Sequence, residues 1–319
     1  MTIFLSTLNQ MSFLVLLILI GYILSRSEII PDYGAGLLSK LENCVFIPAL
    51  VLGTFMQNFT LERIHVAGQY LALGFFVILI TMPIAVLLAR MCTRDHYTRN
   101  IYTYGLAFSN FGFMGNAVVA ALFPDIFMEY LIFVLPFWFF IYVWGVPTLL
   151  IPSEGEKKSF GDCLRNLVNP MFAAMLVGMI IGLINPPMPP FFTSAVTSLG
   201  NCMSPIAMLL TGMTIARIDL KSTFTNWSIY VVSAIRLILI PLAAIAVLAV
   251  IMIMTPVSIP YGLVLCTVCS LAMPLGLNTI VVPSAYGMDT SVAAGMALIS
   301  HLFSCLTIPV VFMLFDMIL

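Results

Sequence analysis

The chain has 319 residues, of which 62% are hydrophobic and 8% are charged, and its formal net charge at pH 7 is −1. Soluble domains average about 45–50% apolar and roughly 25% charged residues, so this composition predicts a polytopic membrane protein. The near-neutral charge offers no basic surface to a nucleic acid. The partner that we expect over most of the surface is the lipid bilayer.

Ten apolar segments are long enough to cross a bilayer as helices, because about 20 residues span its hydrocarbon core. In chain order, the expected spans are 4–24, 36–57, 66–90, 100–123, 127–151, 167–186, 191–216, 227–254, 259–287 and 290–318. The loops between them are short, and the longest is 153–166. The predicted fold class is an all-α polytopic membrane protein with ten transmembrane helices.

Positive charge is concentrated in alternate loops. With their flanks, the odd-numbered loops contain Arg26, Lys40, Arg90, Arg94, Arg99, Lys157, Lys158, Arg165, Arg217 and Lys221. The even-numbered loops contain Arg63 alone. Since Lys and Arg accumulate in cytoplasmic loops, we expect the odd-numbered loops to be cytoplasmic and both termini to lie outside the cell membrane.

The two halves of the chain resemble each other. "LENCVFIPALVLG" at 41–53 is similar to "LGNCMSPIAMLLTG" at 199–212, and Pro83 and Pro241 recur at the same offset. Each half would hold five helices, an odd number, so the second copy would enter the membrane from the opposite face, as in the inverted repeats of secondary transporters. The expected division is a first repeat at 1–152, a cytoplasmic linker at 153–166 and a second, inverted repeat at 167–319.

Two of the expected spans contain helix-weakening residues and amides. "SNFGFMGNAVV" at 109–119 lies within 100–123, and "MPLGLN" at 273–278 lies within 259–287. Irregular backbone at membrane depth is tolerated only against protein or a water-filled cavity. One such interruption would be explained by close helix packing, but two in corresponding helices favour a substrate site.

The residues at these breaks favour an anionic ligand. No carboxylate lies near either break. The second half-helices are expected to begin near Asn116 and Asn278, and half-helix N-termini present unpaired N–H groups and positive dipole ends. A carboxylate is the simplest such ligand. The candidate substrate-binding residues are Asn110, Gly112, Gly115, Asn116, Pro274, Gly276, Asn278 and Arg236.

Other polar residues within the spans allow more than one interpretation. Arg236 could be the counter-ion of the substrate, could cap backbone carbonyls or could snorkel towards the cytoplasm, and the sequence leaves these roles open. His301 could relay protons, although a neutral histidine bonded between helices is favoured. Lys40 and Glu42 form either an interfacial ion pair, which is favoured, or a gate.

Gly178 and Gly182 form a G-x-x-x-G pattern in the expected span 167–186. This pattern permits close helix packing. We expect it to pack within the chain rather than at a dimer seam. The sequence leaves the question of a homodimer open.

The chain resembles the auxin efflux carrier family, in particular its bacterial branch. The resemblance rests on "SNFGFMGN" at 109–116, "NPMFAAMLVGMIIG" at 169–182, "NCMSPIAMLLTGM" at 201–213, "MPLGLN" at 273–278 and the run 300–309, and it covers essentially the whole chain. It implies the sodium/proton-antiporter-like fold, in which two broken helices cross. It also implies transport of organic anions, namely indole acetate in plants and malonate or malate-like dicarboxylates among bacterial relatives.

The resemblance implies binding roles for Asn110, Asn116, Pro274 and Asn278. Relatives usually have a proline where this chain has Ala117, which weakens the expectation of a sharp break there. Related bile-acid symporters use a glutamate in the second broken helix for sodium, and 259–287 contains none. A proton is therefore better supported than sodium as a coupling ion.

These observations predict a secondary transporter that moves a small organic anion, a mono- or dicarboxylate, by alternating access. The alternative is a transporter-derived membrane sensor or a channel without active transport. A membrane enzyme is not expected, because the chain lacks a His-Glu-x-x-His motif and a P-loop. We predict no catalytic residue, metal ligand or cofactor.

Overall fold

The computed structural model describes residues 2–31, 33–151, 170–216, 226–254 and 259–318. These ranges are almost entirely helical, and the extended pairing within them is one antiparallel bridge between Ser109 and Leu275. The expected linker at 153–166 lies outside the described residues. The prediction of an all-α membrane protein is confirmed.

Several short helices follow one another without a loop, and three π-helical turns lie in the first half of the chain. The elements up to residue 150 are α1 Thr2–Arg26, α2 Gly34–Leu41, η1 Glu42–Phe46, α3 Ile47–Asn58, α4 Ile64–Cys92, α5 His96–Ala107, η2 Phe111–Gly115, α6 Asn116–Leu122, η3 Pro124–Ile126, α7 Phe127–Phe133, α8 Leu135–Phe140 and η4 Ile141–Leu150. The later elements are α10 Pro170–Ile184, α11 Pro190–Asn201, α12 Met203–Ile215, α14 Trp227–Ala234, η5 Ile235–Leu239, α15 Ile240–Met254, α16 Tyr261–Ala272, α17 Asn278–Ala285 and α18 Ser291–Ile318.

Six helices in the described ranges are long and apolar enough to cross a membrane. They are Phe4–Arg26, Gly34–Asn58, Val66–Cys92, Pro124–Leu150, Trp227–Met254 and Ser291–Ile318. Shorter apolar helices occupy parts of other expected spans, namely Phe111–Leu122, Pro170–Ile184 and Tyr261–Ala272. Two of these are short because the chain leaves the helix at the breaks that the sequence indicated.

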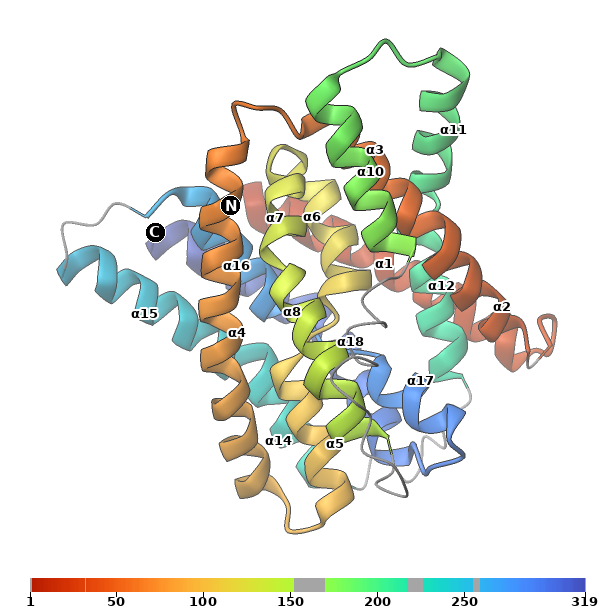
Figure 1. The fold of residues 1–319 in the computed structure, drawn as a ribbon. Helices are drawn as coiled ribbons and strands as arrows, with labels where there is room; N and C mark the ends of the chain where they lie inside the picture. Colours follow the sequence, from red (N-terminus) through yellow and green to blue (C-terminus); the bar gives the residue numbers. More distant parts are fainter. Residues whose placement is uncertain (1, 32, 152–169, 217–225, 255–258, 319) are drawn as a thin grey trace.

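The helices form two groups, with α3, α10 and α11 of one at the upper right of Figure 1 and α4, α15 and α16 of the other at the left. In one group α1 packs along α12, and α3 packs against α10 and α11. In the other, α4 packs against α5 and α7, and α15 against α16. The long helix α18 contacts α1 from the first group and α16 from the second, and it also packs against α14.

Glycines allow the closest helix contacts in the first group. A Cβ atom at Gly21 would collide with the carbonyl oxygen of Leu209, and one at Gly212 with that of Ile18, so α1 and α12 touch backbone to backbone. Side chains at these two positions would force the helices apart.

The G-x-x-x-G pattern also packs within the chain. A Cβ at Gly178 would lie 2.9 Å from the Cβ of Phe55, and one at Gly182 would lie 2.7 Å from the carbonyl oxygen of Phe59. Both glycines therefore face α3, as the sequence favoured.

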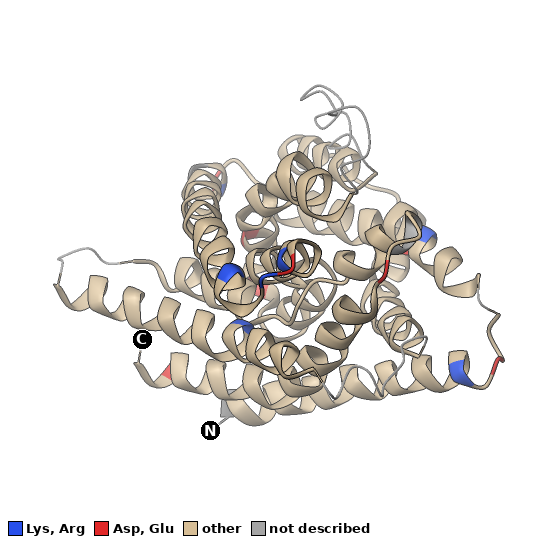
Figure 2. Ribbon diagram, turned by 90° about the horizontal axis from the view of Figure 1, so that it is seen from below, with Lys and Arg blue, Asp and Glu red and all other residues tan. Residues whose placement is uncertain are grey.

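The outer faces of several helices are apolar. Phe76 and Leu87 on α4, and Val247 and Ile253 on α15, are exposed. Figure 2 shows how few charged residues interrupt the ribbon. Exposed side chains of this kind suit contact with lipid.

Helix α5 begins with a polar N-cap residue, directly after the connection from α4. Asp95 is the N-cap residue, and its carboxylate accepts a 2.7 Å hydrogen bond from the amide of Thr98. This hydrogen bond lowers the pKa of the Asp95 carboxyl below its ordinary value. The connection lies at the lower end of the molecule in Figure 1, opposite the 59–63 connection at the top.

Candidate substrate site

The first break separates α5 from the π-turn η2. Helix α5 ends at Ala107, and Phe108 has extended backbone with φ −117° and ψ 107°. The helix resumes at Phe111, where the amide of Gly115 closes a π-turn on the carbonyl of Asn110 at 3.0 Å. The break therefore forms without a proline, although Ala117 had weakened that expectation.

The second break separates α16 from α17. Helix α16 ends at Ala272, Met273 is extended with φ −68° and ψ 150°, and α17 begins at Asn278. Pro274 and Gly276 lie within the non-helical stretch. The interruption thus falls where the "MPLGLN" motif predicted it.

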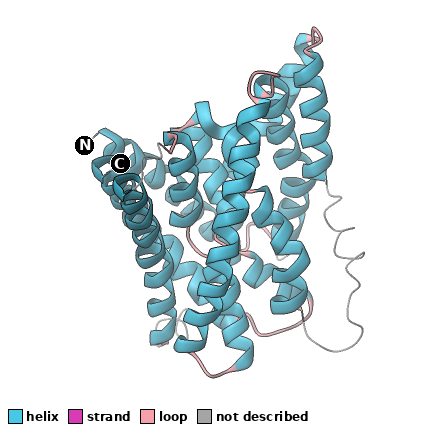
Figure 3. Ribbon diagram, turned by 60° about the vertical axis from the view of Figure 1, so that its left-hand side comes forward, coloured by secondary structure: helices cyan, strands magenta, loops and turns pink. Residues whose placement is uncertain are grey.

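The two breaks are bonded to each other. The amide of Asn110 donates to the carbonyl of Pro274 at 2.7 Å, next to the bridge between Ser109 and Leu275. A Cβ at Gly276 would lie 3.1 Å from the carbonyl oxygen of Phe108, so glycine permits this approach. Figure 3 shows non-helical chain in the middle of the molecule as well as at its ends. The structure therefore brings Asn110, Pro274 and Gly276 together.

The start of the first half-helix differs from the expected position. We expected unpaired amides near Asn116, but its N–H already bonds to the carbonyl of Phe111 within the helical run. Because the π-turn begins at Phe111, the first-turn amides are those of residues 111–114. The second half-helix begins at Asn278 as predicted.

The motif glycines serve close packing against the neighbouring helices α7 and α8. A Cβ at Gly112 would lie 2.6 Å from the ring of Trp138, and one at Gly115 would collide with the hydroxyl of Tyr130. That hydroxyl donates to the carbonyl of Phe111 at 3.2 Å. The glycines thus let α7 and α8 hold the break in place.

Two of the three asparagines bond to other helices. The Asn110 side-chain amide lies 3.0 Å from Nε2 of His301, whose Nδ1 lies 2.7 Å from the carbonyl of Ala297. Since a carbonyl only accepts, Nδ1 carries the proton and Nε2 accepts from Asn110. This is the neutral, helix-bridging histidine that the sequence favoured. The side-chain amide of Asn278 donates to the hydroxyl of Tyr104 on α5 at 3.0 Å.

Asn116 differs from the other two asparagines. Its side chain is 3% exposed, and its Oδ1 has no hydrogen-bond partner among the described residues. Buried polar atoms are nearly always bonded, and an unpaired one is costly. Of the candidate residues, Asn116 therefore has the clearest unmet hydrogen-bonding capacity, at an oxygen that would accept from a donor group.

Arg236 is bonded to the ends of both broken helices. The side chain is fully buried, and it donates to the carbonyls of Leu106 at 2.9 Å, Met273 at 3.1 Å and Ser270 at 3.2 Å. Helix C-termini carry partial negative charge, so the guanidinium neutralises the ends of α5 and α16 where they meet. Of the roles that the sequence left open, this geometry supports the capping of carbonyls.

A cavity of about 180 Å³ lies between α3, α11 and the α6–α7 connection. Its lining is Ala49, Leu50, Gly53, Thr54, Gln57, Asn58, Ala120, Pro124, Phe127, Val196, Thr197, Gly200 and Asn201. Ala120 follows Asn116 by one helical turn and so lies on the same face of α6. The candidate residues predicted from the sequence do not line this cavity.

Sequence reasoning missed the polar lining of the cavity. Thr54, Gln57 and Asn58 come from α3, and Thr197 and Asn201 from α11. The available signal was that these polar residues are spaced three or four apart within apolar segments, which places them on one helix face.

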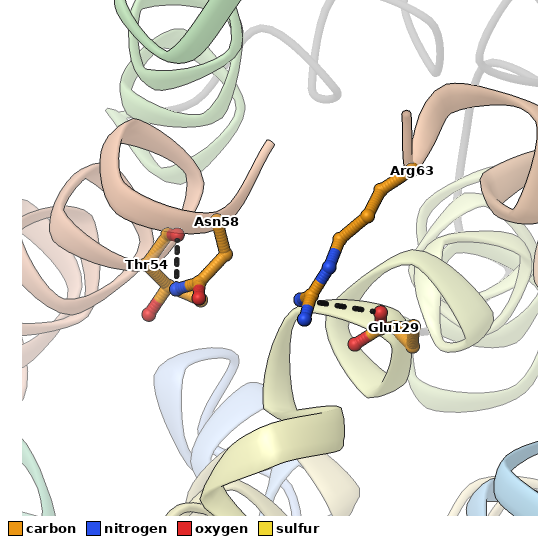
Figure 4. A network of polar contacts seen from close by, with 4 residues as sticks. All are labelled: Thr54, Asn58, Arg63 and Glu129. Atoms are coloured by element: carbon orange, nitrogen blue, oxygen red, sulfur yellow. Dashed lines mark hydrogen bonds and ion pairs between the residues drawn. The ribbon is translucent and has the colours of Figure 1, made fainter. Parts of the chain in front are cut away.

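One ion pair lies near the same end of the molecule. Nη1 of Arg63 is 3.5 Å from Oε1 of Glu129 on α7. Figure 4 shows this pair beside Thr54 and Asn58, where the side-chain amide of Asn58 donates to the carbonyl of Thr54 at 2.9 Å. Arg63, the cation of the even-numbered loops, is therefore paired, although its side chain is 43% exposed.

Comparison with known proteins supports the membrane-transport interpretation. No match was found among curated proteins. A family model described as membrane transport protein matches residues 6–312, which is almost the entire chain and includes both breaks. The chain therefore belongs to this family of auxin efflux carrier-type membrane transport proteins.

Proposed function

We propose that the protein is a secondary carrier that moves a small organic anion, a mono- or dicarboxylate, across the cell membrane by alternating access. In this proposal its ten helical segments cross the membrane as two inverted repeats of five. The α5–η2–α6 helix of the first repeat and the α16–α17 helix of the second then occupy equivalent positions.

The observation that carries the proposal is the pairing of two broken helices beside a buried amide without a partner. The bond between Asn110 and Pro274 joins the breaks, and Asn116 follows the first break within two turns. Broken helices that meet at mid-membrane are the usual place for a transported substrate.

The charges around the two bonded breaks support an anion as the substrate. The described helices α5, η2, α6, α16 and α17 contain no Asp or Glu. Arg236 already neutralises the C-terminal ends of α5 and α16. The positive N-terminal ends of the two following half-helices have no such compensation from an acidic side chain, and they favour a negative ligand.

Counterflow in proteoliposomes tests the proposal. Vesicles containing purified protein would be loaded with unlabelled malonate, malate, acetate or indole acetate and diluted into the same labelled compound. A carrier should concentrate label transiently in the vesicles for at least one compound, and protein-free vesicles should not. Flux without counterflow would indicate a channel and the absence of flux would indicate a sensor, and either result would overturn the proposal.

A further inference from the structure

The helix Gly34–Asn58 contains a buried acidic residue in a distorted turn. Glu42 is 0% exposed, and neither oxygen of its carboxylate has a hydrogen-bond partner among the described residues. It begins the π-turn η1, where the amide of Ile47 bonds to the carbonyl of Glu42. π-Turns inside α-helices are frequent at functional sites.

No cation compensates this carboxylate within the described part of the chain. Helices α10, α11 and α12 pack against η1, and none of them contains a titratable side chain. On its own helix the nearest titratable residues are Lys40 and Cys44, which are both exposed, as is Cys202 between α11 and α12. Among the described residues, Lys40 and Glu42 do not form the ion pair that the sequence favoured.

A proton is the ligand that fits these surroundings best. An isolated carboxylate inside a membrane protein is costly when charged and much less so when neutral. A metal ion would require several oxygen, nitrogen or sulfur ligands. Within the described residues, no group of three or more His, Cys, Asp or Glu side chains could hold one.

Glu42 lies on the same helix as the polar cavity. Ala49 at the cavity wall follows it by seven residues, which corresponds to roughly 10 Å along the helix axis. The buried carboxylate does not line this cavity, but it lies in the same group of helices that forms the cavity wall. A rearrangement that moved these helices relative to α6 would change the access of water to both places.

We propose that Glu42 is the proton-binding site of this carrier and that its proton moves together with the anion. This inference rests on the proposed function. A bound anion makes a second negative charge in the membrane more costly, so Glu42 stays protonated while the substrate is carried. After the substrate leaves, the O–H bond of the carboxyl breaks, the proton passes to water, and the carboxylate keeps the electron pair until it is protonated again on the other side.

The test compares net uptake with exchange in vesicles that contain wild type, Glu42→Gln or Glu62→Gln. Glu62 is an exposed glutamate in the 59–63 connection and serves as the matched control. The probe is radiolabelled malonate, or the compound of the counterflow panel that wild type exchanges, with potassium and valinomycin to hold the membrane potential at zero. For one proton per anion, a gradient of one pH unit, acidic outside, supports about tenfold accumulation.

We expect this accumulation for wild type and Glu62→Gln but not for Glu42→Gln, which mimics the protonated state and should still exchange label at equal pH. Retained exchange also shows that the variant is folded. The inference would be overturned if accumulation by wild type did not depend on the pH gradient, or if it depended on a sodium gradient instead. The inference would also be overturned if Glu42→Gln accumulated the labelled compound like wild type. The same holds if Glu42→Asp exchanged the label but showed no accumulation driven by the pH gradient. If wild type exchanges no carboxylate at all, the proposed function itself fails.

Discussion

At the scale of single residues, the three asparagines at the breaks are in different bonding states. Asn110 is held by His301 and Asn278 by Tyr104, whereas the amide oxygen of Asn116 has no partner. A bonded amide must exchange its partner before it can bind a ligand, whereas the side-chain NH2 of Asn116 can donate to a carboxylate and its free oxygen can accept from a hydroxyl or protonated carboxyl of the ligand. We therefore expect Asn116 to contribute more to affinity than either of the others.

Substitution of Asn116 tests this expectation. The loss of one hydrogen bond to a charged ligand should cost about 1.5–3 kcal/mol, so Asn116→Ala should weaken anion binding roughly ten- to a hundredfold. Asn116→Asp should bind more weakly still, because it places a negative charge beside the anion. Affinity would be measured by titration calorimetry and melting temperature by fluorimetry.

Asn43 offers a matched control, since it is exposed and bonds only within its own helix, to Ser39. Asn43→Ala should bind normally. If Asn116→Asp bound a carboxylate as tightly as wild type, the anion site at this residue would be refuted.

At the scale of helices, the contact between the two breaks depends on neutralising the partial negative charges of two helix C-termini that face each other inside the membrane. Three carbonyls from α5 and α16 converge on Arg236, a residue of η5. Without the guanidinium these carbonyls would be buried without partners, and each unsatisfied group costs about 1–3 kcal/mol.

We predict that Arg236 variants lose stability rather than affinity. Arg236→Gln should lower the free energy of unfolding by about 3–5 kcal/mol. Arg236→Lys should also destabilise the protein, because an ammonium lacks the planar fork that reaches three carbonyls. Thermal unfolding and binding would be measured on the same preparations. A variant that melts like wild type but no longer binds the anion would instead assign Arg236 to the substrate.

The sequence predicted the breaks better than it predicted their partners. Glycines, Pro274 and the two amide motifs identify the interrupted helices from local chemistry alone. The first break nevertheless begins at Phe108, before the motif glycines, because pairing with the second break decides where α5 ends. That pairing joins residues more than 160 positions apart, and no local pattern encodes it.

The spacing of the polar residues that line the cavity was a weak signal for a different reason. Thr54 and Gln57 lie in a helix with one face against protein and another exposed. In a membrane both faces are apolar, so the periodicity that distinguishes inside from outside in soluble helices is weak.

At the scale of the whole molecule, three of the connections between described helices lie at two opposite ends. The 59–63 and 185–189 connections lie at the top of Figure 1 and the 93–95 connection at the bottom. The distribution of Lys and Arg predicts that the bottom end is cytoplasmic.

Cysteine labelling checks this orientation. In a cysteine-free background, Thr60→Cys and Ser27→Cys introduce thiols at exposed positions in two successive connections. An impermeant thiol reagent applied to intact cells should label Thr60→Cys, and Ser27→Cys should react only after the cells are opened. The reverse pattern would invert the topology.

The backbone contacts of Gly21 with Leu209 and of Gly212 with Ile18 have a mechanical consequence for any transport motion. Backbones that touch directly cannot slide past each other by a change of side-chain rotamer, so α1 and α12 move as one unit. The same holds for α10, whose Gly182 lies against the backbone of α3. Each of these units joins a helix from the first half of the chain to one from the second, as does the crossing itself. In the proposed alternating-access motion, we therefore expect the parts that move against each other not to be the two halves of the sequence, and each moving part to contain helices from both.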